Sequence, residues 1–204
     1  MTLRALALSA LLPCLALAVA HGSEWDKDKI LGNPSAPVAI EIWASFDCPH
    51  CALLHEKFLP QMIRDLANTG KAVIIFREFP LSGPEHVHAR EAANIATAAA
   101  RIGKYNQVSE ALFKSQTTWA VNGKVWDAVA PVLSPAELAK VKSLSTDPGV
   151  VSEVERDYQS GMAAGINRTP TMMVISQKTG KRWPFGGMPE FYEPFRDFVL
   201  NDVK

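Results

Sequence analysis

Hydrophobic residues follow two different periods along the chain, and the change between them divides it into three parts. Four segments, 38–46, 72–81, 169–176 and 182–187, are short and rich in β-branched and aromatic residues, which is typical of strands. Between the second and third of them, residues 85–165 are rich in alanine, glutamate, lysine and leucine and lack such runs. This order predicts an α/β sheet with an inserted α-helical subdomain.

The first helix is expected directly after the first strand, because apolar residues recur there at helical spacing over 54–66. Pro60 lies inside it and predicts a kink or a break. A closing helix is expected over 188–204, where Pro194 also falls inside the pattern.

Two helix starts in the inserted block have recognisable caps. Ser134 precedes Pro135, and Glu137 stands at the third helical position, which is the pattern of a capping box. Asp147 before a proline opens a second helix in the same way. We therefore expect one helix to begin after Ser134 and another after Asp147.

The first twenty residues differ from the rest of the chain. Arg4 is their one charge, and it is followed by an apolar run that ends in the small-x-small motif AVA. This pattern is typical of a secretory signal peptide cleaved between Ala20 and His21. A membrane anchor is disfavoured, because the run is shorter than the about 20 apolar residues of a spanning helix and contains Pro13. Export implies an oxidising compartment, where paired cysteines can form a disulfide.

We therefore expect four parts along the chain. They are a signal peptide over 1–20, a lead-in segment over 21–37, a sheet domain made of 38–84 and 166–204, and the helical subdomain over 85–165. The length of 204 residues, 48% of them hydrophobic, suits one domain with a large insertion. Basic and acidic residues balance at 21 each, so no electrostatic footprint for nucleic acid is present.

Cys48 and Cys51 flank a proline and a histidine where the first strand gives way to the first helix. A structural zinc site needs four ligands, and the chain has no second cysteine pair, while His55, His86 and His88 form no H-x₃₋₅-H spacing among themselves. A structural disulfide closing so short a loop would remove little entropy from the unfolded chain. Redox chemistry is therefore the favoured interpretation.

The local geometry supports that interpretation. With Pro49 at the first helical position, backbone N–H groups and the helix dipole point at the sulfur of Cys48 and lower its pKa. His50 can add a further donor or a positive charge. Cys51 stands one turn on and is expected to lie deeper. A stabilised thiolate is a good leaving group, so the oxidised pair tends to pass its disulfide to another protein.

The strand–CPHC–helix unit, the export signal, the helical insertion and Thr169-Pro170 together resemble the DsbA-type thiol:disulfide oxidoreductases of the bacterial periplasm. The resemblance covers most of residues 38–200 and implies a thioredoxin-like fold with a helical insertion. It also implies a cis peptide bond before Pro170, facing the cysteine pair and keeping metals off it. The backbone of Thr169 would pair with an extended substrate peptide.

The activity that the resemblance implies is protein dithiol oxidation, with Cys48, Pro49, His50 and Cys51 as catalytic residues and no cofactor or metal. The substrates would be exported proteins with free cysteines, and a membrane quinone-linked protein would reoxidise the pair. The chain is expected to be a periplasmic monomer. Alternatives are a disulfide isomerase or reductase on the same fold, a metal-binding or chaperone module that uses the cysteine pair, and a small-molecule transferase.

Two acidic residues near the cysteines raise questions of their own. Many relatives have a buried acid six residues before the first cysteine, and Ile42 occupies that position here. Glu41 is the candidate proton relay, although on a regular strand it would face the other way. Asp47 directly precedes Cys48, and a carboxylate there would raise the thiol pKa unless it points to solvent.

Overall fold

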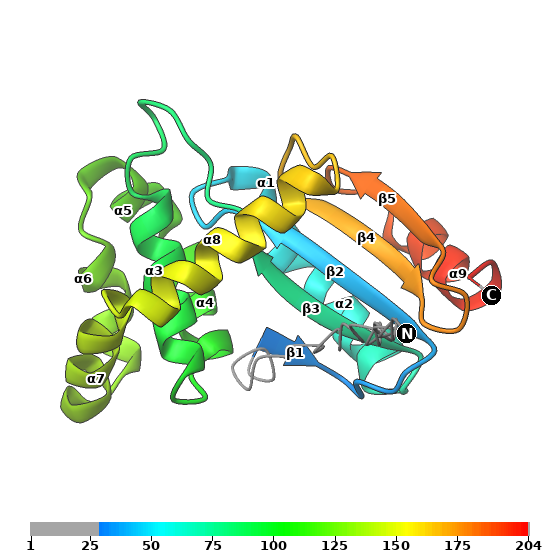
Figure 1. Cartoon of the computed structure of the whole chain (residues 1–204), viewed down its shortest axis with the longest axis horizontal. Helices are drawn as coiled ribbons and strands as arrows, with labels where there is room; N and C mark the ends of the chain where they lie inside the picture. The colour runs from blue at the N-terminus through cyan, green and yellow to red at the C-terminus, as the bar shows by residue number, and fades with distance from the viewer. Residues whose placement is uncertain (1–28, 204) are drawn as a thin grey trace, which may run out of the picture.

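A five-stranded mixed sheet, ordered β1-β3-β2-β4-β5, forms the centre of the computed structural model (Figure 1). The structure describes residues 29–203, so the predicted signal peptide and its cleavage site lie outside the described part. Strand β2 is parallel to β3 and antiparallel to β4, and the edge strands β1 and β5 are antiparallel to their neighbours. The strands are β1 (Ile30–Leu31), β2 (Val38–Ala44), β3 (Ala72–Glu78), β4 (Thr171–Ser176) and β5 (Arg182–Gly186).

The four predicted strands are all present, and β1 is an addition. It lies in the segment that the sequence indicated only as a lead-in. Its two residues, Ile30 and Leu31, pair with Ile75 and Ile74 at the edge of the sheet. Two residues are too few to show a period of two, so the hydrophobic pattern alone could not reveal this strand.

The helix that follows β2 runs from residue 49 to residue 67 and does not break at Pro60. A wider π-helical turn lies directly before the proline and another lies after it. Such turns accommodate a residue that cannot donate a hydrogen bond to the preceding turn, which is why the expected break is absent. The segments are α1 (Pro49–Leu53), η2 (Leu54–Phe58), α2 (Leu59–Met62) and η3 (Ile63–Ala67).

The inserted block is helical throughout, and both predicted caps are present. The Ser134 Oγ accepts a hydrogen bond from the Glu137 N–H at 3.3 Å, and Glu137 Oε2 accepts one from the Ser134 N–H at 2.8 Å. Asp147 Oδ1 accepts a hydrogen bond from the Gly149 N–H at 2.8 Å. The helices are α3 (Ala89–Ala100), α4 (Tyr105–Lys114), α5 (Gln116–Asn122), α6 (Val125–Val129), η4 (Ala130–Val132), α7 (Pro135–Ser145) and α8 (Pro148–Ala163).

Helices cover both faces of the sheet. Helix α8 crosses one face on its way back from the inserted block, and α2 and α9 (Tyr192–Asn201) lie on the other face (Figure 1). The backbone of α8 comes very close to the sheet at Gly161, where an added Cβ would lie 2.7 Å from the Phe79 ring and 2.8 Å from that of Trp43. Pro194 lies in the first turn of α9, where an N–H group needs no partner, so the helix is not broken.

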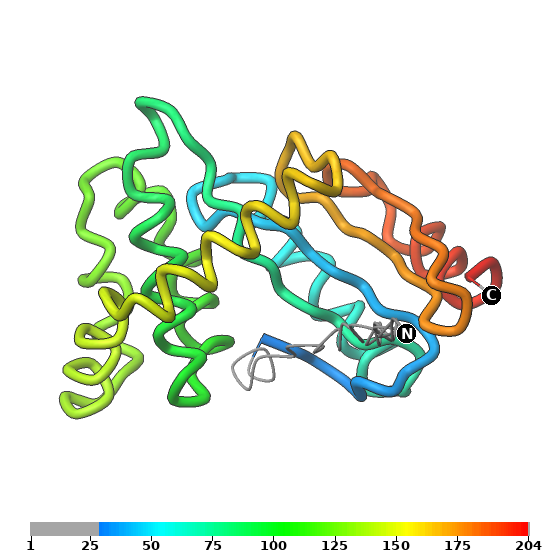
Figure 2. The backbone as a smooth tube through the Cα atoms, viewed as in Figure 1, coloured from blue at the N-terminus to red at the C-terminus, as the bar shows by residue number. Residues whose placement is uncertain are grey.

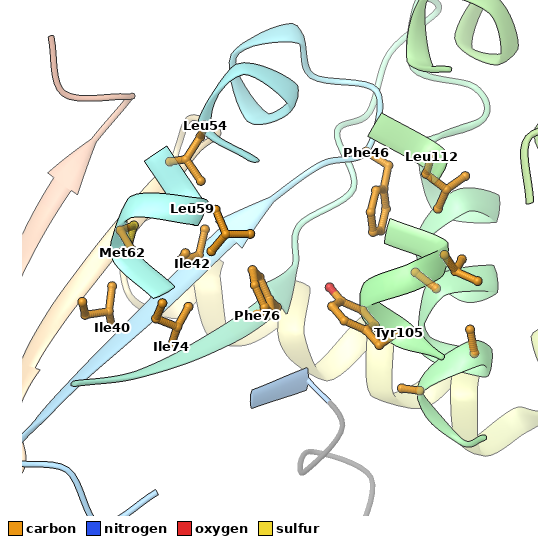
Figure 3. Close-up of a cluster of buried hydrophobic side chains, with 14 of the residues drawn as sticks. Ile40, Ile42, Phe46, Leu54, Leu59, Met62, Ile74, Phe76, Tyr105 and Leu112 are labelled. Atoms are coloured by element: carbon orange, nitrogen blue, oxygen red, sulfur yellow. The ribbon is translucent and has the colours of Figure 1, made fainter. Parts of the chain in front are cut away.

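One hydrophobic core joins the sheet to the inserted block (Figure 3). Its labelled side chains come from β2, from the loop and the helix after it, from β3 and from α4: Ile40, Ile42, Phe46, Leu54, Leu59, Met62, Ile74, Phe76, Tyr105 and Leu112. The backbone trace in Figure 2 shows the chain leaving the sheet after β3, forming the block and returning through α8 to β4. No helix within residues 29–203 is long and apolar enough to cross a membrane.

Candidate active site

The two cysteines lie together at the N-terminus of α1. Cys48 is the N-cap residue of this helix, and Pro49 occupies the first helical position, as the sequence predicts. Both cysteines are free thiols in this structure. Cys48 is 5% exposed and Cys51 is 1% exposed, while Pro49 and His50 are exposed to solvent. The second cysteine is therefore the more deeply buried of the pair.

The surroundings of the two sulfur atoms push their pKa values apart. Hydrogen bonds lower the pKa of Cys48 to about 5, against the opposing effect of burial. They come from the Cys51 thiol, from Thr169 and from the backbone N–H groups of Cys51 and His50. Burial raises the pKa of Cys51 well above its usual value, and the neighbouring Cys48 adds to the rise. Near neutral pH the pair therefore consists of a Cys48 thiolate and a Cys51 thiol.

The segment before β4 lies directly against Cys48. The peptide bond between Thr169 and Pro170 is cis, as the resemblance implies. The Cys48 Sγ lies 3.4 Å from the Thr169 carbonyl oxygen, although the two residues are 121 positions apart in the chain. The Thr169 hydroxyl is buried, and the Thr169 side chain lowers the pKa values of both cysteines. The fold thus brings a polar backbone segment to the edge of the cysteine pair.

His50 contributes to this site through its backbone. Its N–H group is one of the donors that lower the pKa of Cys48. The side chain points toward solvent. The first turn of α1 therefore stabilises the thiolate with main-chain dipoles, as expected for an anion at a helix N-terminus.

Glu41 lies on the side of β2 that faces away from the cysteines. Strand β2 pairs regularly with both neighbours, so no bulge turns the side chain around. The carboxylate forms ion pairs with Arg77 at 2.8 Å and with Arg182 at 2.9 Å. Its neighbour Ile42 lines a cavity together with Cys51. The structure therefore places Glu41 apart from the cysteine site that it was expected to serve.

A different acid, Glu78 at the end of β3, lines the same small cavity as Cys51 and His55. It is 2% exposed, and Tyr105 donates a hydrogen bond to its Oε1 at 2.9 Å. Burial raises the pKa of Glu78 to about 7, against the opposing effect of Lys29. Sequence analysis missed this residue; the available signal was an acid at the end of a strongly hydrophobic strand.

Asp47 does not point to solvent. Its side chain is 3% exposed, and its two carboxylate oxygens have separate partners. Oδ1 accepts a hydrogen bond from the Ser45 hydroxyl at 2.5 Å, and Oδ2 lies 2.6 Å from His86 Nδ1. The charge beside Cys48 is thus buried and faces a histidine from the loop after β3.

The inserted block also reaches the site. The Gln116 side chain, from α5, donates hydrogen bonds to the carbonyl oxygens of Phe46 at 2.5 Å and Cys48 at 3.0 Å. A glutamine in a helical pattern carries no signal of such a distant contact, so sequence analysis did not identify it. Among residues 29–203, no three His, Cys, Asp or Glu side chains are grouped as metal ligands. The chemistry open to this arrangement is thiol–disulfide exchange at the cysteine pair.

Comparison with known proteins gives the same fold. A family model described as Thioredoxin matches residues 24–185. A candidate protein-disulfide oxidoreductase of Rickettsia prowazekii (strain Madrid E) is 23% identical over 167 residues, which are 82% of this chain and 54% of that protein. The chain thus spans about half the length of the curated relatives it matches.

Two solved structures are similar over nearly the whole chain. A cysteine-substituted variant of alpha-DsbA1 from Wolbachia pipientis has a TM-score of 0.72 at 23% identity, with 86% of this chain and 89% of that chain covered. Oxidised BdbD from Bacillus subtilis has a TM-score of 0.67 at 19% identity, with 87% and 94% covered. The predicted thioredoxin-like fold with a helical insertion is therefore confirmed.

Proposed function

The chain belongs to the thioredoxin family, and from this premise we propose that it is a DsbA-type thiol–disulfide oxidoreductase that donates the Cys48–Cys51 disulfide to exported proteins. The observation that carries the proposal is the contrast between the two sulfur atoms. Cys48 has a pKa of about 5, while burial keeps Cys51 protonated. A pair in which the reduced form is stabilised in this way is an oxidant.

The reaction proceeds in two exchanges. A substrate thiolate attacks the Cys48 Sγ, the bond between Cys48 and Cys51 breaks, and a mixed disulfide joins Cys48 to the substrate. A second substrate thiolate then attacks the substrate sulfur of that mixed disulfide, and Cys48 leaves as a thiolate. The substrate loses two electrons and gains a disulfide, and the enzyme pair gains both electrons. The hydrogen bonds to Cys48 favour its departure in the second step.

The first exchange also needs a proton. Cys51 leaves as a thiolate in a buried position that favours the thiol. Glu78 lines the same cavity, which has room for about one water molecule. Its pKa of about 7 allows it to give or take a proton near neutral pH. We therefore assign to Glu78 the proton-transfer role that was expected at Glu41.

Replacement of Glu78 with glutamine tests this assignment. We expect E78Q to slow dithiol oxidation near neutral pH roughly tenfold, below the 10²–10⁴-fold range of a full general acid because a cavity water can still carry protons. The measurement is the rate of oxidation of a dithiol peptide as a function of pH. E41Q is the matched control, because Glu41 is also a buried carboxylate on a strand but faces away from Cys51. Equal rates in E78Q and E41Q would contradict the assignment.

The remaining parts of the proposal concern partners and place. The Thr169 backbone, beside Cys48, suits main-chain pairing with an extended substrate peptide next to cis Pro170. The signal-peptide pattern of residues 1–20 supports a periplasmic location. A membrane quinone-linked protein would reoxidise the pair, and the redox centre itself requires no cofactor or metal.

The reduction potential of the Cys48–Cys51 pair is the experiment that tests the function. Equilibration of the purified mature protein with glutathione buffers should give a value near about −120 mV, as for a disulfide donor. A value near about −270 mV would instead indicate a reductase or isomerase on this fold. If no redox transition occurs, the proposal fails and a metal-binding or chaperone role for the cysteine pair takes its place.

A further inference from the structure

Asp47 and His86 form a buried charge pair beside the reactive cysteine. His86 Nδ1 lies 2.6 Å from Asp47 Oδ2, a distance as short as charge-assisted hydrogen bonds reach. The Asp47 side chain is 3% exposed and that of His86 is 22% exposed, so solvent screens the pair only partly. Neither residue takes part in the exchange mechanism described above.

The hydrogen-bond partners of Asp47 suit a carboxylate. The Ser45 hydroxyl accepts a hydrogen bond from the Leu81 N–H at 3.1 Å and directs its own proton to Asp47 Oδ1. When Nδ1 of His86 carries a proton, it donates to Oδ2, and both oxygens of Asp47 then act as acceptors, as in the charged form. This arrangement suits a negative charge in the residue next to Cys48.

Such a charge opposes a thiolate. In a poorly screened site, a carboxylate near the Cys48 sulfur disfavours the ionised form of the cysteine. A positively charged His86 ring on the same carboxylate cancels most of the rise that the carboxylate causes in the pKa of Cys48. Within residues 29–203, the ion pairs of His86 are with Asp47 and, at 3.9 Å, with the exposed Glu85 of its own loop. The compensation at the cysteine thus depends on one histidine from the loop after β3.

We propose that His86 is a positioning residue for the exchange reaction: as an imidazolium it neutralises the buried Asp47 carboxylate and so preserves the thiolate of Cys48. This inference rests on the proposed function, because it concerns the same cysteine. It adds a role for the loop between β3 and α3. That loop is bound to the cysteine loop at two points, by His86 to Asp47 and by Leu81 to Ser45.

Charge-changing variants at the two positions test the proposal. In H86Q the amide can still donate a hydrogen bond to Asp47 but carries no charge, so we expect the pKa of Cys48 to rise by about 1 unit. In D47N the positive histidine remains and the pKa should fall by about 1 unit. The double variant D47N/H86Q should lie close to the wild type. The ultraviolet absorbance of the thiolate reports Cys48 alone in this range, because Cys51 titrates far higher.

Two controls separate charge from folding. H88Q changes a histidine of the same loop whose ring lies against Gly123, and it should leave the titration unmoved. H86K keeps a positive charge and should stay near the wild type, so it covers the case in which H86Q does not fold. If His86 had only a structural role, the variants would change the free energy of unfolding. The pKa of Cys48 would then not move in opposite directions in H86Q and D47N.

The outcomes of these Cys48 titrations differ from those of the reduction-potential measurement that tests the proposed function. Opposite shifts in the two single variants and their cancellation in the double variant support the proposal. An unchanged Cys48 titration in folded H86Q or in folded D47N overturns it. Neither result depends on substrate oxidation, whereas failure of the proposed function would appear as a missing or strongly negative reduction potential in the wild type.

Discussion

Replacement of Cys48 with serine is expected to abolish dithiol oxidation, leaving only the uncatalysed rate. Without the Cys48 sulfur no disulfide can form with Cys51, and the thiolate that α1 stabilises no longer exists. The measurement is the oxidation of a reduced dithiol peptide by the purified protein, followed by thiol titration. Retained activity in C48S would exclude the proposed mechanism.

The companion variant C51A separates the roles of the two sulfur atoms. It keeps the Cys48 nucleophile but lacks the thiol that would resolve a mixed disulfide, so adducts between Cys48 and substrate should accumulate when substrate disulfides are supplied. Peptide mass spectrometry under non-reducing conditions locates the linkage. An adduct at any residue other than Cys48 would contradict the assignment.

The low pKa of Cys48 makes the stability of the reduced protein and the reactivity of Cys48 depend on pH. The pKa of Cys48 is depressed from an ordinary value of 9.0 to about 5 in the folded protein. The thiolate therefore stabilises the reduced fold fully only above pH 9.0, and this stabilisation is lost as the pH falls toward 5. Alkylation of reduced Cys48 should lose half of its rate near pH 5.

Replacement of Lys29 with methionine should lower the free energy of unfolding by about 3 kcal/mol, at the lower end of the 3–5 kcal/mol range for a broken buried ion pair. Lys29 is 2% exposed and its Nζ lies 3.1 Å from Glu153, 3.2 Å from Asp157 and 3.7 Å from Glu78. K29M leaves these three carboxylates buried without their shared cation. Arginine neighbours of Glu153 and Asp157 limit the loss.

Denaturant unfolding of the reduced protein measures this effect. K57M is the control, because Lys57 and its partner Glu56 are both exposed, and such pairs contribute about 0–1 kcal/mol. The deficit of K29M should shrink as the pH falls, because protonation of Glu78 removes one of the buried charges. A loss below about 1 kcal/mol at neutral pH would show that the cluster does not depend on Lys29.

The parts of the structure that sequence analysis anticipated depend on neighbours in the chain. Strands appear where β-branched residues cluster, the capping box at Ser134 spans four residues, and Pro49 follows Cys48 directly. Of the kink or break expected at Pro60, the break is absent, because a π-helical turn is a local alternative to it that leaves no mark in the pattern.

The parts that were missed depend on contacts between distant segments. Asp47 and His86 are 39 residues apart, and Gln116 is 68 residues from Cys48. Glu78 was missed because its importance arises from a cavity shared with Cys51, which only the packing of β3 against α1 and α4 creates. A single sequence gives the residue types for such a site but not their distances.

The position of the outer helices has an evolutionary consequence. Helices α6 and α7 pack mainly on α3 and α4, and no strand pairs with them. Substitutions at the solvent-facing positions of these helices therefore do not alter the strand register, whereas their buried Val125, Val129 and Val141 share the core with the sheet. Sequence change at the outer positions of this flank is therefore compatible with retention of the strand pairing that places the two cysteines.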